Sequence, residues 1–238
     1  MQFLDLTLPT LAANLALDEA LLLAAEDGGP ECLRIWHWPS PAVVLGAGGK
    51  VRDDVDVEAC NTNAVPIARR SSGGGTVLLG PGCLLYSLVL RFDRNPTLGD
   101  LRASYRYILS NVIDALTPIA SPLTIEGFSD LAWHGRKFSG NAQQRKRTHL
   151  LHHGTLLLNG FDSSAVSRYL TLPPRRPEYR NDRPHDDFLT QLPTDSETVT
   201  DRLGEAWEAE QDLIAWPETM VAKLLAEQYT QAEWVFRR

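Results

Sequence analysis

Apolar residues recur at helical intervals in two long segments of this chain. In residues 10–26, Leu11, Leu15 and Leu22 stand among alanines, without Pro or Gly. Residues 101–116 repeat the spacing with large side chains, namely Tyr105, Ile108, Leu109, Val112 and Leu116. Because residues three and four apart share one face of a helix, both segments are predicted to be helices.

Shorter apolar runs bounded by Gly and Pro predict β-strands at residues 34–38, 42–45, 66–68, 77–79, 84–91, 131–133 and 150–158. The first two are predicted to form a pair turned at Pro39-Ser40-Pro41. Further helices are expected at residues 55–61 and 163–170, and as two helices within 198–228 that separate near Trp216-Pro217.

The order of these elements indicates the fold class. Strands and helices are interleaved without a regular βαβ rhythm, which favours an α+β fold with a mixed β-sheet flanked by helices. The 238 residues, 43% of them hydrophobic, are enough to bury a full core. We therefore predict a single domain over residues 1–238, with a helical C-terminal extension from about residue 196.

Composition and charge narrow the function classes. A net charge of −7 argues against general nucleic-acid binding, and no apolar run approaches the roughly 20 residues that cross a bilayer. Three cysteines, at 32, 60 and 83, form neither a disulfide framework nor a zinc pattern. These features favour a cytoplasmic protein that binds neither nucleic acid nor membrane.

Two glycine-bearing segments carry the most specific chemistry. Residues 69–76 read RRSSGGGT and residues 135–142 read GRKFSGNA. Each is predicted to place small residues beside a cation between strands, so that backbone N–H groups can approach an anion. A third segment, HHGTLLLN at residues 152–159, could add an imidazole to the site rim. Together the segments suggest one anionic ligand held from two sides.

The helix at residues 10–26 offers a further polar pair. Asn14 and Asp18 lie four residues apart and share a face, from which they could reach a neighbouring loop. A plain polar helix surface explains the pair equally well.

The runs RRSSGGGTVLLGPGCLLYSLVL, SDLAWHGRKFSGNAQQRKR and LLHHGTLLLNGFD resemble the catalytic domain of the lipoate-protein ligase A family. This family belongs to the superfamily of biotin and lipoate ligases and octanoyltransferases. The resemblance extends from about Asn14 to Tyr169. It implies activation of lipoate, or a similar medium-chain acid, by ATP and Mg²⁺, and transfer of the acyl group to a lysine of a lipoyl carrier domain.

The resemblance also implies site roles. Lys137 would be the catalytic cation, placed to stabilise charge on the carboxylate and α-phosphate. The acyl group would meet Arg70, Ser72, Gly73, Gly74, Gly75, Thr76, His153 and Gly154. The nucleotide would meet Asp130, Lys137, Ser139, Gly140, Asn141 and Ala142, with Asp130 a possible Mg²⁺ ligand. For Asp130 the end of a strand, and for His153 a buried structural histidine, are alternative roles.

The positions of the cysteines distinguish ligases from octanoyltransferases within this superfamily. Its octanoyltransferases use a thiol nucleophile in the second half of the chain, and no cysteine follows Cys83. Direct attack of the acceptor lysine on an acyl-adenylate is therefore expected. The alternatives are an ATP-independent octanoyl or lipoyl transferase, the transfer half of a two-part ligase, a biotin ligase, or a non-catalytic ligand-binding module.

A cluster of arginines in a Pro-rich loop adds a partner hypothesis. Arg175, Arg176, Arg180 and Arg183 are predicted to steer an acidic lipoyl carrier, although salt bridges within the domain are an equal alternative. The chain ends at Arg238, too early for the accessory domain of many such ligases. Three explanations stay open: the accessory part is a separate subunit, this subgroup activates its acid without one, or the protein accepts a preformed acyl-adenylate.

Overall fold

The computed structural model describes residues 1–173 and 176–238. Its centre is an eight-stranded mixed sheet in the order β11-β1-β2-β6-β10-β9-β8-β7. These strands are Gln211–Asp212, Gln2–Asp5, Cys32–His37, Cys83–Arg91, His149–Leu157, Arg136–Arg145, Asp130–Trp133 and Leu123–Glu126. A smaller sheet, β4-β3-β5, comprises Ile67–Arg69, Ala42–Leu45 and Val77–Leu79.

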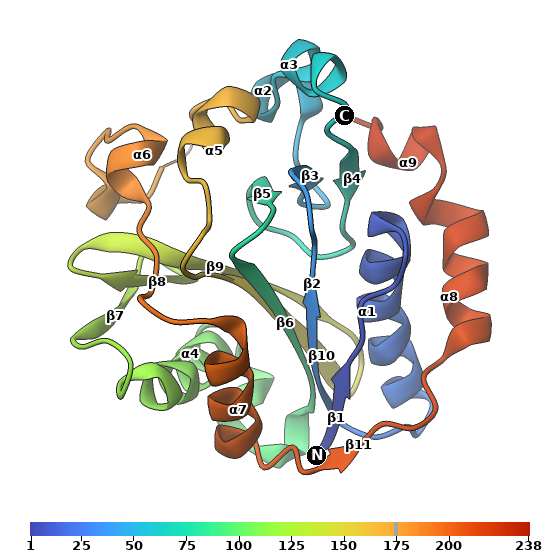
Figure 1. The fold of residues 1–238 in the computed structure, drawn as a ribbon. Helices are drawn as coiled ribbons and strands as arrows, with labels where there is room; N and C mark the ends of the chain where they lie inside the picture. Colours follow the sequence, from blue (N-terminus) through green and yellow to red (C-terminus); the bar gives the residue numbers. More distant parts are fainter. Residues whose placement is uncertain (174–175) are drawn as a thin grey trace.

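Helices cover both faces of the large sheet (Figure 1). Helices α1 (Leu11–Glu26) and α8 (Glu218–Leu224, continued by η4, Leu225–Tyr229) lie on one face, and α4 (Leu101–Leu116) and α7 (Ser196–Ala206) lie on the other. The shorter helices are α2 (Val51–Asp54), α3 (Val57–Thr62), η1 (Phe92–Arg94), η2 (Pro96–Gly99), α5 (Ser164–Tyr169), η3 (Glu178–Arg180), α6 (His185–Phe188) and α9 (Ala232–Val235).

Strand β6 shows why the core has two halves. Its apolar residues alternate, with Leu85 and Val89 packing toward α1, and Leu84 and Leu88 packing toward α4. Because successive side chains in a strand point to opposite faces, a run of apolar residues must be buried on both. The mixed sheet between helices confirms the predicted α+β class.

Most predicted elements are present, and two predictions are wrong. The strands predicted at 34–38 and 42–45 do not pair with each other, because β2 joins the large sheet and β3 the small one. Residues 136–145 are strand β9 rather than a loop between strands, since they pair with β8 on one side and β10 on the other. Strands β1, β7 and β11 were not predicted.

The C-terminal helices are built into the same core. Helix α7 packs against α4, whereas α8 packs against α1 on the opposite face. Arg69, fully buried at the end of β4, donates hydrogen bonds to the carbonyl oxygens of Val235 and Gly49. Residues from about 196 onward therefore support the sheets, and we infer that residues 1–238 form one unit.

No helix in the described part of the chain combines the length and apolar character that crossing a membrane requires.

Candidate functional site

A cavity lies between the large sheet and the glycine loop, defined here as residues 70–76. Its walls are mostly apolar, and they include Leu15, Trp36, Val44, Val77, Leu79 and Leu85. Polar side chains also line it, among them Asp18, Arg70, Lys137, His153 and Thr155. An apolar tail with one polar end fits such a lining, because the apolar walls bury the tail and the polar groups orient the polar end. We call this space the first cavity.

Arg70 stabilises the glycine loop through hydrogen bonds to other residues of the same loop. Its Nε donates to the Ser72 hydroxyl at 3.0 Å, and its Nη2 donates to the carbonyls of Gly73 at 2.6 Å and Gly75 at 2.8 Å. Gly74 has φ of +85°, and a Cβ there would lie 2.9 Å from Arg70 Nη2. Burial lowers the Arg70 pKa to about 10, so the group remains charged near neutral pH. Its hydrogen bonds set the shape of the loop.

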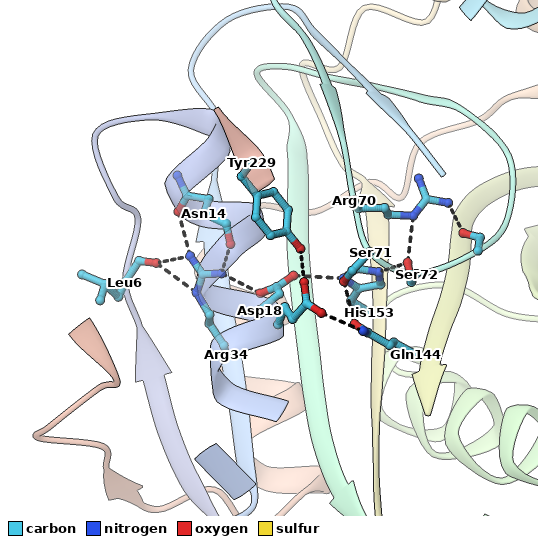
Figure 2. Close-up of polar contacts among 12 residues, drawn as sticks. Leu6, Asn14, Asp18, Arg34, Arg70, Ser71, Ser72, Gln144, His153 and Tyr229 are labelled. Carbon is cyan, nitrogen blue, oxygen red and sulfur yellow. Dashed lines mark hydrogen bonds and ion pairs between the residues drawn. The ribbon is translucent and has the colours of Figure 1, made fainter. Parts of the chain in front are cut away.

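His153 links the glycine loop to helix α1. Its Nδ1 lies 2.9 Å from Asp18 Oδ2, and its Nε2 lies 2.6 Å from the Ser72 hydroxyl (Figure 2). Because the Asp18 carboxylate can only accept, Nδ1 donates to it, and in the neutral ring Nε2 accepts from Ser72. The serine is almost fully buried, at 1% exposure, and it does not line the first cavity. A series of hydrogen bonds from Asp18 through His153 and Ser72 to Arg70 therefore positions the glycine loop.

Asp18 also belongs to a buried ion pair. Arg34 Nη1 lies 2.6 Å from Asp18 Oδ1, and the other guanidinium donors meet Asn14 Oδ1 and the Leu6 carbonyl (Figure 2). Burial raises the Asp18 pKa, but the charge of Arg34 and the hydrogen bond from His153 together hold it below its ordinary value. The carboxylate is thus ionised and available to orient His153.

Replacement of His153 by alanine is expected to raise the KM for the ligand that occupies the first cavity by about 5- to 30-fold, with a smaller effect on kcat. Removing the ring breaks two hydrogen bonds, each worth about 1 kcal/mol, that hold the glycine loop. Steady-state kinetics would measure the split between KM and kcat.

His149→Ala is the matched control, because His149 also lies on β10 and pairs with a carboxylate, Glu26, but it lines neither cavity at this site. Equal changes of KM in the two variants would contradict a role in loop positioning.

Lys137 and Asp130 come together on adjacent strands. The ammonium of Lys137 lies 2.7 Å from Asp130 Oδ1, and the Tyr179 hydroxyl donates to Asp130 Oδ2 at 2.8 Å. A Cβ at Gly140 would lie 2.8 Å from the Lys137 Nζ, so the absence of a side chain there leaves room for the ammonium. Burial, followed by the charge of Asp130, raises the Tyr179 pKa well above its ordinary value, and the phenol stays a donor.

A second cavity adjoins the first at Lys137. Both share Asp130, Lys137 and Gly140 in their linings, and the second extends toward Arg180, His185 and Phe188. Its volume is about 340 Å³, compared with about 130 Å³ for the first. The second is thus within the range of small-molecule pockets, and a ligand that fills both would pass beside the Lys137 ammonium.

The structure brings most of the predicted site residues together. Arg70, Gly74, Gly75, Thr76, His153 and Gly154 line the first cavity, while Ser72 and Gly73 do not. Asp130, Lys137, Ser139 and Gly140 line the second cavity, whereas Asn141 and Ala142 line only the first. The Asn141 amide is engaged with Ser129, Ser139 and Tyr86, so it supports the sheet beside the cavity.

Among the described residues, no group of side chains forms a dedicated metal site. Within residues 1–173 and 176–238, no cluster of three or more acidic, His or Cys side chains could hold a metal ion. Both oxygens of Asp130 already accept hydrogen bonds, from Lys137 and Tyr179. A Mg²⁺ ion shared between Asp130 and ligand phosphates stays a prediction from the resemblance.

The arginine cluster is divided by the fold. Arg176 forms an ion pair with Asp182 at 2.8 Å, and Arg183 donates to the carbonyls of Gly135 and Tyr179. Arg180 is buried, at 4% exposure, so the prediction that it meets a carrier at the surface is wrong. Arg175 lies outside the described residues. Carrier docking stays a prediction for Arg176 and Arg183.

Several groups at the site were not assigned from the sequence. Tyr179 was missed because nothing in its local pattern indicates that the loop returns to Asp130. Asp18 was noted only for its helix face, and the helical spacing from Asn14 was the available signal. His152, beside His153, is a structural residue, because it is fully buried against Tyr86 and Gln143 and lines neither cavity.

None of the three cysteines is a nucleophile at this site. All are buried, and neither cavity is lined by one. Burial raises the pKa of Cys32 and of Cys83 to about 12 and also raises that of Cys60. A thiol with a raised pKa is inert near neutral pH, because the thiolate is the reactive form.

Curated relatives with similar sequences are named octanoyltransferases or, in Mycoplasma pneumoniae, a probable lipoate-protein ligase A. The chain is 31% identical to the octanoyltransferase LipM of Moorella thermoacetica over 175 residues, which cover 64% of this chain and 64% of that protein. It is 27% identical to the octanoyltransferase LipM of Kyrpidia tusciae, with 95% of each chain covered. The match thus spans less than two thirds of the first relative and nearly all of the second.

Solved structures with the same fold include ligases. A bipartite lipoate protein ligase from Thermoplasma acidophilum, described together with its E2 lipoyl domain, matches with a TM-score of 0.84 at 22% identity, over 99% of this chain and 95% of that one. A lipoate-protein ligase A bound with ATP matches with a TM-score of 0.79 at 23% identity, over 99% of each chain. At these identities the likeness shows the fold.

The sequence profile of the lipoyl protein ligase A/B catalytic domain matches residues 10–197, which include the glycine loop, Lys137 and His153. This chain therefore belongs to the family of lipoyl protein ligase A/B catalytic domains.

Proposed function

We propose that this protein is an enzyme that transfers an octanoyl or lipoyl group to a specific lysine of a lipoyl carrier domain. The observation that carries the proposal is the position of Lys137, whose ammonium lies where the mostly apolar first cavity meets the second. The first cavity suits the acyl tail, and the second suits the group that leaves. The names of the curated relatives support the acyl group, and the neighbour described with its E2 lipoyl domain supports the acceptor.

The chemistry follows from that placement. The neutral amine of the acceptor lysine attacks the acyl carbonyl, an amide bond forms, and the bond from the acyl carbon to the donor breaks. Negative charge develops on the carbonyl oxygen as the amine adds, and the Lys137 ammonium, already beside the cavity junction, would stabilise it. The proton released by the amine goes to the leaving group or to water.

Two kinds of acyl donor, an acyl carrier thioester and an acyl-adenylate, are each favoured by different observations. Several of the matched relatives are named octanoyltransferases, which favours transfer from an acyl carrier without ATP, although one is named a probable lipoate-protein ligase A. The three buried cysteines and the roomy second cavity instead favour an acyl-adenylate made from ATP, because no thiol is available to take over the acyl group. In either case the acceptor lysine would attack the donor directly.

Three parallel reactions would separate these donors. A lipoyl carrier domain would be incubated with the protein and either octanoyl carrier protein, octanoate with ATP and Mg²⁺, or preformed octanoyl-adenylate. Intact mass of the acceptor and release of pyrophosphate would be measured, and each reaction repeated with lipoyl donors. Modification by the carrier thioester alone identifies an ATP-independent transferase, and modification with pyrophosphate release identifies a ligase.

Preformed adenylate as the one effective donor would identify the transfer half of a two-part ligase, for which a separate accessory subunit supplies adenylation. An acceptor that gains no acyl mass from any donor would refute the proposed function.

A further inference from the structure

Arg180 is a buried cation with no salt-bridge partner in residues 1–173 and 176–238. It lies in the short helix η3, its side chain lines the second cavity, and 4% of its surface is exposed. Within the described residues no carboxylate forms a salt bridge with it, although its neighbours Arg176 and Lys137 both have one. Burying a charge without a counter-charge is unfavourable, so this position requires a physical explanation.

The hydrogen bonds of Arg180 are incomplete. Its Nε donates to the Arg183 carbonyl at 2.9 Å, and its guanidinium stacks over the Phe188 ring at 4.6 Å. Its Nη2, in contrast, is buried and meets no hydrogen-bond partner among the described residues. Burial and then the charge of Arg176 lower the Arg180 pKa, which is the expected response of an uncompensated cation.

The surroundings of Arg180 favour an anionic ligand. The same cavity is lined by Lys137, and the carboxylate that could neutralise Arg180, Asp130, is already bound by Lys137 and Tyr179. The other carboxylate in the lining, Asp54, accepts a hydrogen bond from Thr76. The Arg180 guanidinium is thus held against Phe188 at the cavity wall, and it has N–H donors that form no hydrogen bond among the described residues.

We propose that Arg180 binds the phosphate group of the acyl donor in the second cavity. A planar guanidinium recognises phosphate oxygens with paired hydrogen bonds, and such charge-assisted bonds are among the strongest available to a side chain. The inference rests on the proposed function and deepens it. Acyl-adenylate and acyl phosphopantetheine both carry a phosphate, so the shared chemistry is a phosphate ester attached to the group that leaves.

The deciding experiment measures binding of phosphate probes to the full chain. Titration calorimetry would give the Kd of AMP and of phosphopantetheine for wild type, Arg180→Gln and Arg202→Gln. We expect Arg180→Gln to weaken the probe that wild type prefers by about 10- to 100-fold, as expected for the loss of a hydrogen bond to a charged group. Arg202→Gln, on helix α7, exposed and paired with Glu205, lines neither cavity and should leave the Kd unchanged.

Each outcome has a defined meaning. Binding of AMP identifies a nucleotide as the source of the phosphate, and binding of phosphopantetheine identifies a carrier. The proposal would be overturned if Arg180→Gln bound both probes as tightly as wild type does. It would also be overturned if the only kinetic effect of Arg180→Gln were a higher KM for the acceptor. If Arg180→Gln lowers the melting temperature, Arg180→Lys is measured instead. Weaker binding of the phosphate probe at wild-type stability would support the proposal, and unchanged binding of the probe would overturn it.

Failure of the proposed function is distinguishable from failure of this inference. If wild type binds a phosphate probe through Arg180 but transfers no acyl group from any of the three donors, the phosphate site stands and the proposed function falls. If transfer proceeds and Arg180→Gln binds the probes as wild type does, the function stands and Arg180 is structural.

Discussion

Replacement of Lys137 by alanine is expected to lower the rate of acyl transfer by about 10²- to 10³-fold. The loss corresponds to about 3–4 kcal/mol of transition-state stabilisation, the range found when one group facing a developing oxyanion is removed. Lys137 is a strong candidate because it lines both cavities and its ammonium is held by Asp130 at 2.7 Å. Single-turnover transfer from a preformed acyl donor to a carrier domain would measure the effect on the chemical step.

Two further variants separate charge from folding in this experiment. Lys146→Ala removes an exposed lysine at the end of the same strand and should transfer the acyl group at the wild-type rate. Lys137→Met keeps most of the side-chain volume without the charge, and it should be as slow as Lys137→Ala. A Lys137→Met enzyme with near wild-type turnover would show that the ammonium is not needed for transfer.

Replacement of Asp18 by alanine is expected to destabilise the protein by about 3–5 kcal/mol, because removing one partner of a buried ion pair leaves the other charge uncompensated. The side chains of Asp18 and Arg34 are exposed by only 3% and 0%. The substitution also frees Nδ1 of His153, so it should loosen the glycine loop as well. Urea unfolding followed by tryptophan fluorescence would measure the change in stability.

An exposed ion pair provides the control for Asp18. Asp93 lies 3.0 Å from Arg91 with both side chains more than half exposed, so Asp93→Ala should change stability little. If both substitutions had the same small effect, the buried pair would not be a major contribution to the fold.

The pH dependence of stability checks the same pair independently. The Asp18 pKa is lower in the folded protein than in the unfolded chain, since Arg34 and His153 together outweigh the effect of burial. Its contribution is therefore complete above the unfolded pKa of about 3.9 and is lost as the pH falls through the lower folded pKa. Wild type should thus lose more stability than Asp18→Ala between about pH 4 and more acidic values.

Elements with strong local patterns were predicted well. The helix expected at residues 101–116 is α4, Leu101–Leu116, and the strand expected at 77–79 is β5, Val77–Leu79. In the first, the apolar spacing and an Asp100 side chain that caps the helix act within a few residues. Local chemistry of this kind can be read from one segment alone.

Strand β9 shows where local reasoning failed. Its sequence, RKFSGNAQQR, is polar and contains glycine, and both features disfavour a strand. It is a strand because β8 and β10 pair with it on both sides, and these partners come from elsewhere in the chain. The pairing of β2 and β3 was mistaken for the related reason that sequence neighbours can belong to different sheets.

The sequence by itself determined the family of this protein and the residue types of its candidate site: the glycine loop, the single lysine in the second glycine segment and the absence of a late cysteine. The tertiary structure alone decided which charges meet. It buried Asp18 between Arg34 and His153, paired Asp130 with Lys137 and Tyr179, and turned Arg180 from a surface residue into the wall of a cavity. The physical reason is that ion pairing and burial depend on distances between segments far apart in the chain, and local spacing does not contain those distances.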